Sequence, residues 1–172
     1  MLRYQFSLLV EAIREGDIKG IRKYFEIPLG DYNVSGVVNS KTLTDNTPLI
    51  LATDEEDFEV VKFLLDNGVD PNLTGRQCLT ILSPLHVAVR SQNFRIINLL
   101  IKRGADINAK DSYGETPIFR LVRPAFEKEK CNPKLLKYLI EKGADMNIKN
   151  LKGQDFYDSL VLDDELSILG AS

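Results

Sequence analysis

The residues of this chain that could carry chemistry are one histidine, two cysteines and two acidic runs. His86 could serve as a general base, but the chain holds no second histidine, and no serine or cysteine is placed as an evident partner. Cys78 and Cys131 stand 53 positions apart without a Cys-x-x-Cys pair, which indicates neither a zinc site nor a disulfide framework. No glycine-rich phosphate loop is present. We therefore expect no enzyme, and no catalytic residue, metal, cofactor or small-molecule substrate.

The acidic runs "DEED" at 54–57 and "DDE" at 163–165 could bind a cation. Neither run has the alternating oxygen ligands and the central glycine of a calcium loop. Both fall where the repeating pattern described below places a turn between two helices. We interpret them as solvent-exposed turns, with cation binding as the alternative.

Composition narrows the class of protein further. The chain has 172 residues, of which 44% are apolar and 27% charged, so we expect one domain over residues 1–172. A net charge of −3 disfavours a nucleic-acid partner, since such proteins usually carry a basic excess, and any basic patch would have to be local. No apolar run approaches the roughly 20 residues that span a bilayer, and charged residues interrupt the N-terminus before a signal peptide could form. We expect a cytoplasmic protein without a membrane partner.

The elements that must position any site come from an internal repeat. Three segments align on a Thr/Ser-Pro start and a late glycine: "TPLILATDEEDFEVVKFLLDNGVDPN" from Thr47, "SPLHVAVRSQNFRIINLLIKRGADIN" from Ser83, and a copy from Thr116 with a six-residue insertion. Weaker copies flank them, and Gly153 aligns with Gly114. The pattern predicts three clear units between two degenerate caps. Their approximate ranges are 2–33, 42–73, 78–109, 111–148 and 150–170.

Each clear unit predicts two helices. A Thr or Ser side chain can cap the first helix, and proline suits its first position. The second helix carries four apolar residues at i, i+1, i+4 and i+5, as in Val60, Val61, Leu64 and Leu65, which places them on one face. A glycine then ends that helix in the left-handed conformation. Because one helix pair cannot cover its own apolar stripe, the pairs must stack.

These residues resemble the ankyrin repeat family, whose "TPLHxA" signature is nearly matched by "SPLHVA" at 83–88, over about residues 2–169. The resemblance implies an all-α solenoid of about five stacked antiparallel helix pairs with β-hairpin finger loops. It also implies that the His86 imidazole hydrogen-bonds to Ser83 at the start of the helix. Phe119 replaces the signature histidine in the third clear unit and Leu121 replaces its small alanine, so we expect looser geometry there, and fraying after Leu162.

In the family, partners are commonly held by finger tips and by exposed positions of the first helices. Carried over by register, the partner-binding positions are Leu43, Thr44, Asn46, Asp54, Glu55, Leu79, Thr80, Leu82, Arg90, Ser91, Ser112, Tyr113, Glu115 and Arg123. An exposed aromatic at a finger tip suits a binding hot spot, so Tyr113 is the strongest candidate. The alternative is that its ring lies over the neighbouring finger.

Three segments have no counterpart in the repeat. The first segment, residues 78–82, has the apolar Cys78, Leu79, Ile81 and Leu82 where a finger is normally polar, and these residues either pack onto the next finger or anchor a partner. Residues 34–41 are predicted to form a mobile loop. The insertion at 124–131 is expected to be a tolerated surface loop, with a recognition role as the alternative.

The function that this sequence favours is a monomeric, non-enzymatic module that binds another protein through its concave finger-and-helix surface, acting by occlusion or tethering. One alternative is a structural subunit that self-associates through residues 79–82. Another is an effector with a site in the 34–41 or the 124–131 segment.

Overall fold

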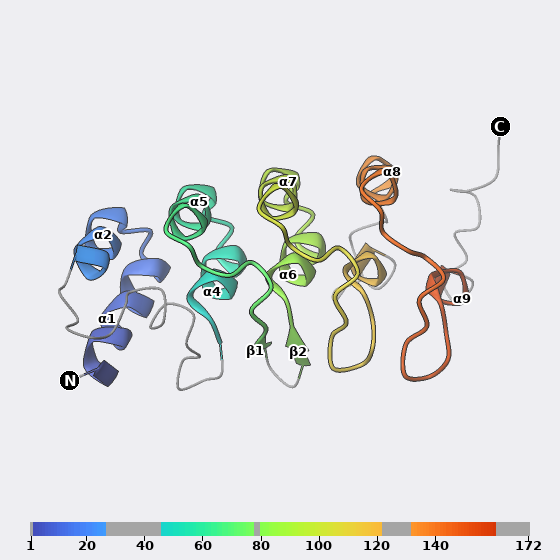
Figure 1. Ribbon diagram of the computed structural model, residues 1–172, viewed down its shortest axis with the longest axis horizontal. Coiled ribbons are helices and arrows are strands. Elements are labelled where there is room, and N and C mark those ends of the chain that lie inside the picture. Colours follow the sequence, from blue (N-terminus) through green and yellow to red (C-terminus); the bar gives the residue numbers. More distant parts are fainter. Residues whose placement is uncertain (1, 27–45, 78–79, 122–131, 161–172) are drawn as a thin grey trace.

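The computed structural model describes residues 2–26, 46–77, 80–121 and 132–160, and in these ranges the chain forms successive helix pairs (Figure 1). The pairs are α1 (Leu2–Arg14) with α2 (Ile18–Glu26), α4 (Pro48–Asp54) with α5 (Phe58–Asp66), α6 (Pro84–Arg90) with α7 (Phe94–Lys102), and the 3₁₀ helix η1 (Pro117–Leu121) with α8 (Pro133–Glu141). The short helix α9 (Phe156–Leu160) follows. Two short strands, β1 (Gly75–Gln77) and β2 (Thr80–Leu82), pair antiparallel.

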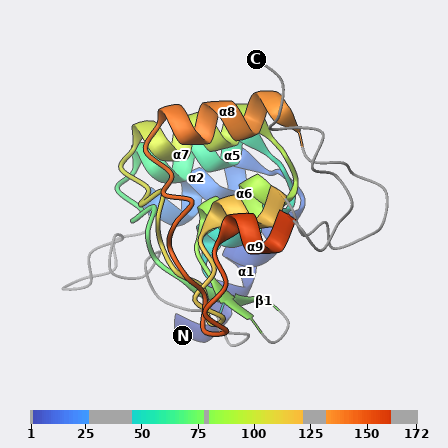
Figure 2. The same cartoon turned by 90° about the vertical axis from the view of Figure 1, so that its right-hand side faces the viewer.

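The helices form two rows. An inner row contains α1, α4, α6, η1 and α9, and each member contacts the next (Figure 1). An outer row contains α2, α5, α7 and α8, which overlap when viewed along the stack in Figure 2. Loops project beyond the inner row on the side away from the outer helices (Figure 1). This arrangement is the stack of antiparallel helix pairs that the repeat predicts.

Local signals at the helix ends act as the sequence predicts. The Thr47 hydroxyl accepts a hydrogen bond from the Ile50 amide at 3.2 Å, with Pro48 at the first helical position of α4. Gly68, Gly104 and Gly143 end the outer helices with φ of 83°, 88° and 99°. These angles lie in the left-handed region that glycine adopts without Cβ strain, so the three predicted stops are confirmed.

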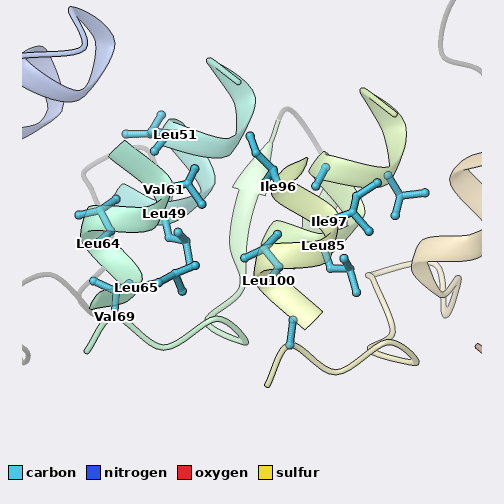
Figure 3. Packing of buried hydrophobic residues seen from close by; sticks show 14 of the residues in the cluster. Leu49, Leu51, Val61, Leu64, Leu65, Val69, Leu85, Ile96, Ile97 and Leu100 are labelled. Atoms are coloured by element: carbon cyan, nitrogen blue, oxygen red, sulfur yellow. The ribbon is translucent and has the colours of Figure 1, made fainter. Parts of the chain in front are cut away.

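The core lies between neighbouring pairs, as Figure 3 shows for α4/α5 against α6/α7. Leu64 and Leu65 of α5 are buried, as are Ile96 and Ile97 of α7. The predicted apolar face is therefore buried, except that the fourth position is only half-buried in α7 and α8. Each buried aliphatic side chain contributes roughly 1.5–3 kcal/mol to the free energy of unfolding. An isolated helix pair would lose this contribution for the side chains that a neighbouring pair covers.

The third clear unit differs from the other two in its first helix. Its helix η1 is a 3₁₀ helix, with a hydrogen bond from the Phe119 amide to the Thr116 carbonyl at 3.0 Å. Phe119 and Leu121, the two residues that depart from the signature, are both buried in it. The core of this unit therefore holds larger side chains at these two positions than His86 and Ala88 in α6. Residues beyond 160, where fraying is expected, lie outside the described ranges.

A consequence of this change is a buried hydroxyl without a partner. The Thr116 Oγ1 atom has no hydrogen-bond partner within the described ranges, since the Phe119 amide, the counterpart of the Ile50 amide that bonds to the Thr47 hydroxyl, donates to the Thr116 carbonyl. Thr116→Val is therefore expected to leave the free energy of unfolding unchanged or to raise it by up to about 1 kcal/mol. The matched Thr47→Val, which removes a formed cap, should lower it by about 1 kcal/mol. Urea unfolding of both variants tests this, and equal losses would contradict it.

Asparagines bridge adjacent units on the outer side of the stack. Asn72 donates from Nδ2 to the Gly104 carbonyl at 2.9 Å and accepts at Oδ1 from the Asp106 amide at 2.7 Å. Asn108 makes the same pair of bonds one unit later, to Gly143 and Asp145, at 3.1 and 2.9 Å. An Asp-x-Asn sequence is typical of a turn. The structure shows that each of these two asparagines also joins its unit to the next.

These bridges have a matched control within the chain. Asn147 occupies the same register, but its Nδ2 donates to Asp145 of its own turn at 3.2 Å. Asn72→Ala and Asn108→Ala are each expected to lower the free energy of unfolding by about 1 kcal/mol, and Asn147→Ala to change it little. Chemical denaturation measures all three. A loss for Asn147→Ala as large as the others would show that the turn, and not the bridge, carries the effect.

Candidate functional site

Three loops, described at residues 73–77 with 80–82, at 109–115 and at 148–154 and hereafter the three projecting loops, form the side of the stack on which the sequence places a partner (Figure 1). The second and third have the same internal bonds. Asp111 accepts at Oδ1 from the Tyr113 and Glu115 amides at 2.8 and 2.9 Å. Asn150 accepts at Oδ1 from the Lys152 and Gln154 amides at 2.9 and 3.0 Å. The side chain at this position therefore fixes each loop in the same tight turn.

Hydrogen bonds also join the loops to one another. The Ser112 amide donates to the Ile81 carbonyl at 3.0 Å, and the Ile81 amide donates to the Ser112 hydroxyl at 3.2 Å. The Leu151 amide donates to the Tyr113 carbonyl at 2.9 Å. At Gly114, where φ is 74°, an added Cβ would lie 3.1 Å from the Leu151 amide nitrogen. Close packing of backbone against backbone thus makes the three loops one surface.

His86 anchors this surface to the inner row. Its Nδ1 atom lies 3.2 Å from the Ser83 amide and 2.8 Å from the Ser83 hydroxyl, and its Nε2 lies 3.0 Å from the Glu115 carbonyl. A carbonyl can only accept, so Nε2 carries the proton and Nδ1 accepts from Ser83. The predicted contact with Ser83 is confirmed, and the contact with Glu115 adds a tie to the second loop.

The electrostatics of His86 suit a structural role. Burial lowers its pKa from the ordinary 6.5 to about 4, although the bond to the Glu115 carbonyl acts in the opposite direction. The imidazole is therefore neutral near pH 7. Its two nitrogens are both engaged within the protein, so it is not placed to take a proton from a substrate.

Apolar side chains are exposed on each of the three loops. The exposed fractions are 39% for Ile81, 50% for Tyr113 and 80% for Leu151. Of the predicted loop positions, Ser112 and Tyr113 are exposed and Thr80 is half-buried.

Two predicted partner-binding positions need correction, because Leu82 and Glu115 are buried. Leu82 packs with Ile50 and Val87 of the inner helices, since the alternation of strand β2 turns it inward while Ile81 points out. Glu115 lies against Asn150, whose Nδ2 atom donates to the Glu115 Oε1 atom at 3.5 Å. Neither side chain is available to a partner.

The predicted inner-row positions lie at the C-terminal ends of α4 and α6. Arg90 of α6 forms an ion pair with Asp54 of α4, with 2.8 Å between Nη2 and Oδ1, so two predicted positions from neighbouring units meet. Glu55 is exposed, and Ser91 is half-buried with its hydroxyl donating to the Ala88 carbonyl at 3.2 Å. Asn46 is half-buried at the start of the described range. The positions that lie outside the described residues are Leu43, Thr44, Leu79 and Arg123, together with the 34–41 and 124–131 segments.

The acidic run at 54–57 lies at the turn between α4 and α5, as predicted, with Asp54 as the last residue of α4. Its first three residues are exposed, and Asp57 caps α5 by accepting from the Glu59 and Val60 amides at 3.0 and 3.1 Å. Within the described ranges, no group of three or more histidine, cysteine or acidic residues is arranged to hold a metal ion. No helix in those ranges is long and apolar enough to cross a membrane. The run at 163–165 lies outside them.

Two exposed apolar residues of the loops were not among the predicted partner-binding positions. Leu151 is in register with the predicted position Ser112, because Gly153 aligns with Gly114. The repeat alignment could therefore have identified Leu151 as a loop position. Ile81 was recognised as apolar, but its exposure depends on which face of β2 is covered. Sequence alone does not decide that face.

Comparison with known proteins agrees with this architecture. A family model described as ankyrin repeats in three copies matches residues 78–150, and a second, described as ankyrin repeats in many copies, matches residues 49–101. A search of curated proteins finds no match. Ankyrin repeats are generally protein–protein interaction modules and are typically not enzymes. Since the matched span of 49–150 covers more than half of the chain and coincides with the stacked helix pairs, the protein belongs to the ankyrin repeat family.

Proposed function

We propose that this protein is a non-enzymatic module that binds another protein through a concave surface made by the three projecting loops and the inner helices α4 and α6. It acts as a monomer of about five units, with the loops as fingers, and it either covers a site on its partner or tethers it. The observation that carries the proposal is Tyr113, an aromatic side chain that is half exposed at the centre of a rigid three-loop surface.

The rigidity of the surface favours binding. The second and third loops are held by side-chain bonds within the turn, backbone bonds join each loop to the next, and His86 is bonded to the second loop. A surface that is already ordered loses little conformational entropy when a partner docks. Its apolar exposure at three neighbouring points also fits a protein interface, where aromatic and aliphatic anchors contribute most of the binding energy.

The experiment compares two aromatic residues of nearly equal exposure on opposite sides of the stack. Tyr113 is 50% exposed on the loops, and Phe94 is 47% exposed on the outer helix α7. The full chain is used to capture partners from lysate, followed by affinity measurement on the purified partner. Tyr113→Ala should weaken binding about tenfold or more, as expected for a hot spot, whereas Phe94→Ala should leave binding unchanged.

Arg90→Glu serves as a second probe, because it reverses the charge at the ion pair with Asp54 on the inner row. Arg90→Glu should weaken the same complex by a smaller factor than Tyr113→Ala, since an exposed ion pair between Arg90 and a partner would contribute little binding energy. If Phe94→Ala abolished capture while Tyr113→Ala and Arg90→Glu had no effect, the binding surface would be the outer helices and this proposal would be wrong.

A further inference from the structure

The three projecting loops carry positive charge as well as apolar side chains. The exposed cations of these loops are Arg76, Lys110, Lys149 and Lys152. The same loops contain only two acidic residues, Asp111 and Glu115, and both are buried. Asp111 pairs with Arg120 of η1, which removes its charge from the loop surface. A protein with a net charge of −3 therefore presents a local basic surface where its exposed apolar residues also gather.

The loop cations have no acidic partner within the described ranges. Lys110 donates from Nζ to the Lys149 carbonyl at 3.4 Å, a bond that leaves its charge uncompensated. Arg76 is exposed on the first loop, and Lys149 and Lys152 are exposed on the third. Such cations are available for pairing with an incoming carboxylate.

The outer row of helices is also rich in lysine and arginine, but many of its cations are engaged. Asp66 accepts from both Lys62 and Arg103, at 2.9 and 2.5 Å, and this pairing lowers the pKa of its carboxyl. The Arg95 guanidinium lies over the Phe58 ring at 4.1 Å from its centre. Positive charge alone therefore does not distinguish the loops from the outer helices. The loops differ because their cations have no acidic partner within the described ranges and lie on the same loops as the exposed Ile81, Tyr113 and Leu151 side chains.

We infer that the segment bound by the three projecting loops is an acidic stretch of a partner protein that also carries apolar side chains. This inference rests on the proposed function and names the chemistry of its partner. The apolar side chains of the segment cover Tyr113 and its neighbours, and its carboxylates pair with the loop cations at the rim. A nucleic acid fits less well, because the overall negative charge of the protein repels a long polyanion and only four cations are offered. A membrane also fits less well, because among the described residues each loop exposes a single large apolar side chain, which is a shallow anchor in a bilayer.

The test selects peptides from a random displayed library on the full chain. The selected pool should be enriched in Asp and Glu together with aromatic and aliphatic residues. A synthetic copy of the dominant peptide is then titrated against two charge-reversal variants. The loop variant is Lys110→Glu/Lys149→Glu/Lys152→Glu, and the control is Lys19→Glu/Lys23→Glu/Lys134→Glu on α2 and α8, with the same change in net charge.

The loop variant should weaken the peptide about tenfold or more, and the control should stay within about twofold of wild type. Binding should also weaken as salt is raised, since the pairs are exposed. Circular dichroism and urea unfolding confirm that both variants fold. Equal weakening in both variants, or a selected pool without an acidic bias, would overturn the inference. A single-stranded oligonucleotide or phosphatidylserine vesicles that bind more tightly than the peptide, and lose binding only in the loop variant, would overturn it in favour of those partners.

The outcome separates this inference from the proposed function. If Tyr113→Ala still weakens a captured protein but the selected peptides lack acidic residues, the loops bind protein by another chemistry. If acidic peptides bind the loops but Tyr113→Ala does not change the binding of captured proteins, the inference about the loops stands. The proposed function, in which the whole concave surface binds the partner, then fails.

Discussion

Replacing Phe119 by alanine is expected to lower the free energy of unfolding by about 3–5 kcal/mol, the largest effect of any substitution considered for this protein. Phe119 is fully buried in η1, and its ring meets Phe156 of α9 edge to face, with 6.3 Å between ring centres and 86° between planes. The truncation removes a large apolar side chain and leaves a cavity that the surrounding helices cannot fill. It also removes a contact between η1 and the last described helix.

The control for Phe119→Ala is Phe94→Ala on α7. Phe94 stacks on Tyr138 with 4.6 Å between ring centres, but it is 47% exposed, so its loss should cost no more than about 1 kcal/mol. Urea unfolding followed by circular dichroism measures both. If the two variants lost similar stability, the ring at position 119 would not be the core element that its burial indicates.

The second large effect is a loss of about 2 kcal/mol in the free energy of unfolding when the pH falls from about 7.5 to about 5. His86 is the only histidine in the chain, and its folded-state pKa of about 4 lies below the ordinary 6.5. Between these two values the unfolded chain binds a proton that the folded protein does not. Lower pH therefore favours unfolding, while the stabilisation is fully present above about 6.5 and is lost as the pH falls toward about 4.

His86→Gln isolates this contribution, because glutamine does not titrate in the range. The variant should be less stable than wild type at pH 7.5, since it cannot reproduce both the Ser83 and the Glu115 contacts. Its stability should then change much less than that of wild type down to pH 5. Urea unfolding at a series of pH values provides the comparison. Parallel curves for the two proteins would show that another group causes the acid sensitivity.

The sequence was sufficient for those features that depend on neighbouring residues along the chain. The Thr/Ser-Pro starts, the apolar face of the second helix and the glycine stops each have a local physical cause, and the structure confirms them at Thr47, Leu64 and Gly68. A shared period then requires stacking, because every unit has an apolar stripe that it cannot cover alone. The contact of His86 with Ser83 followed from the family resemblance.

The contacts between units were decided only by the tertiary structure. The second bond of His86, to the Glu115 carbonyl, and the bridge from Asn72 to the next unit join residues 29 and 32 positions apart. The burial of Glu115 and the exposure of Leu151 likewise depend on how one loop lies against the next. A local pattern specifies which way a residue faces within its own unit, but whether that face meets water or a neighbour is determined by the packing of successive units.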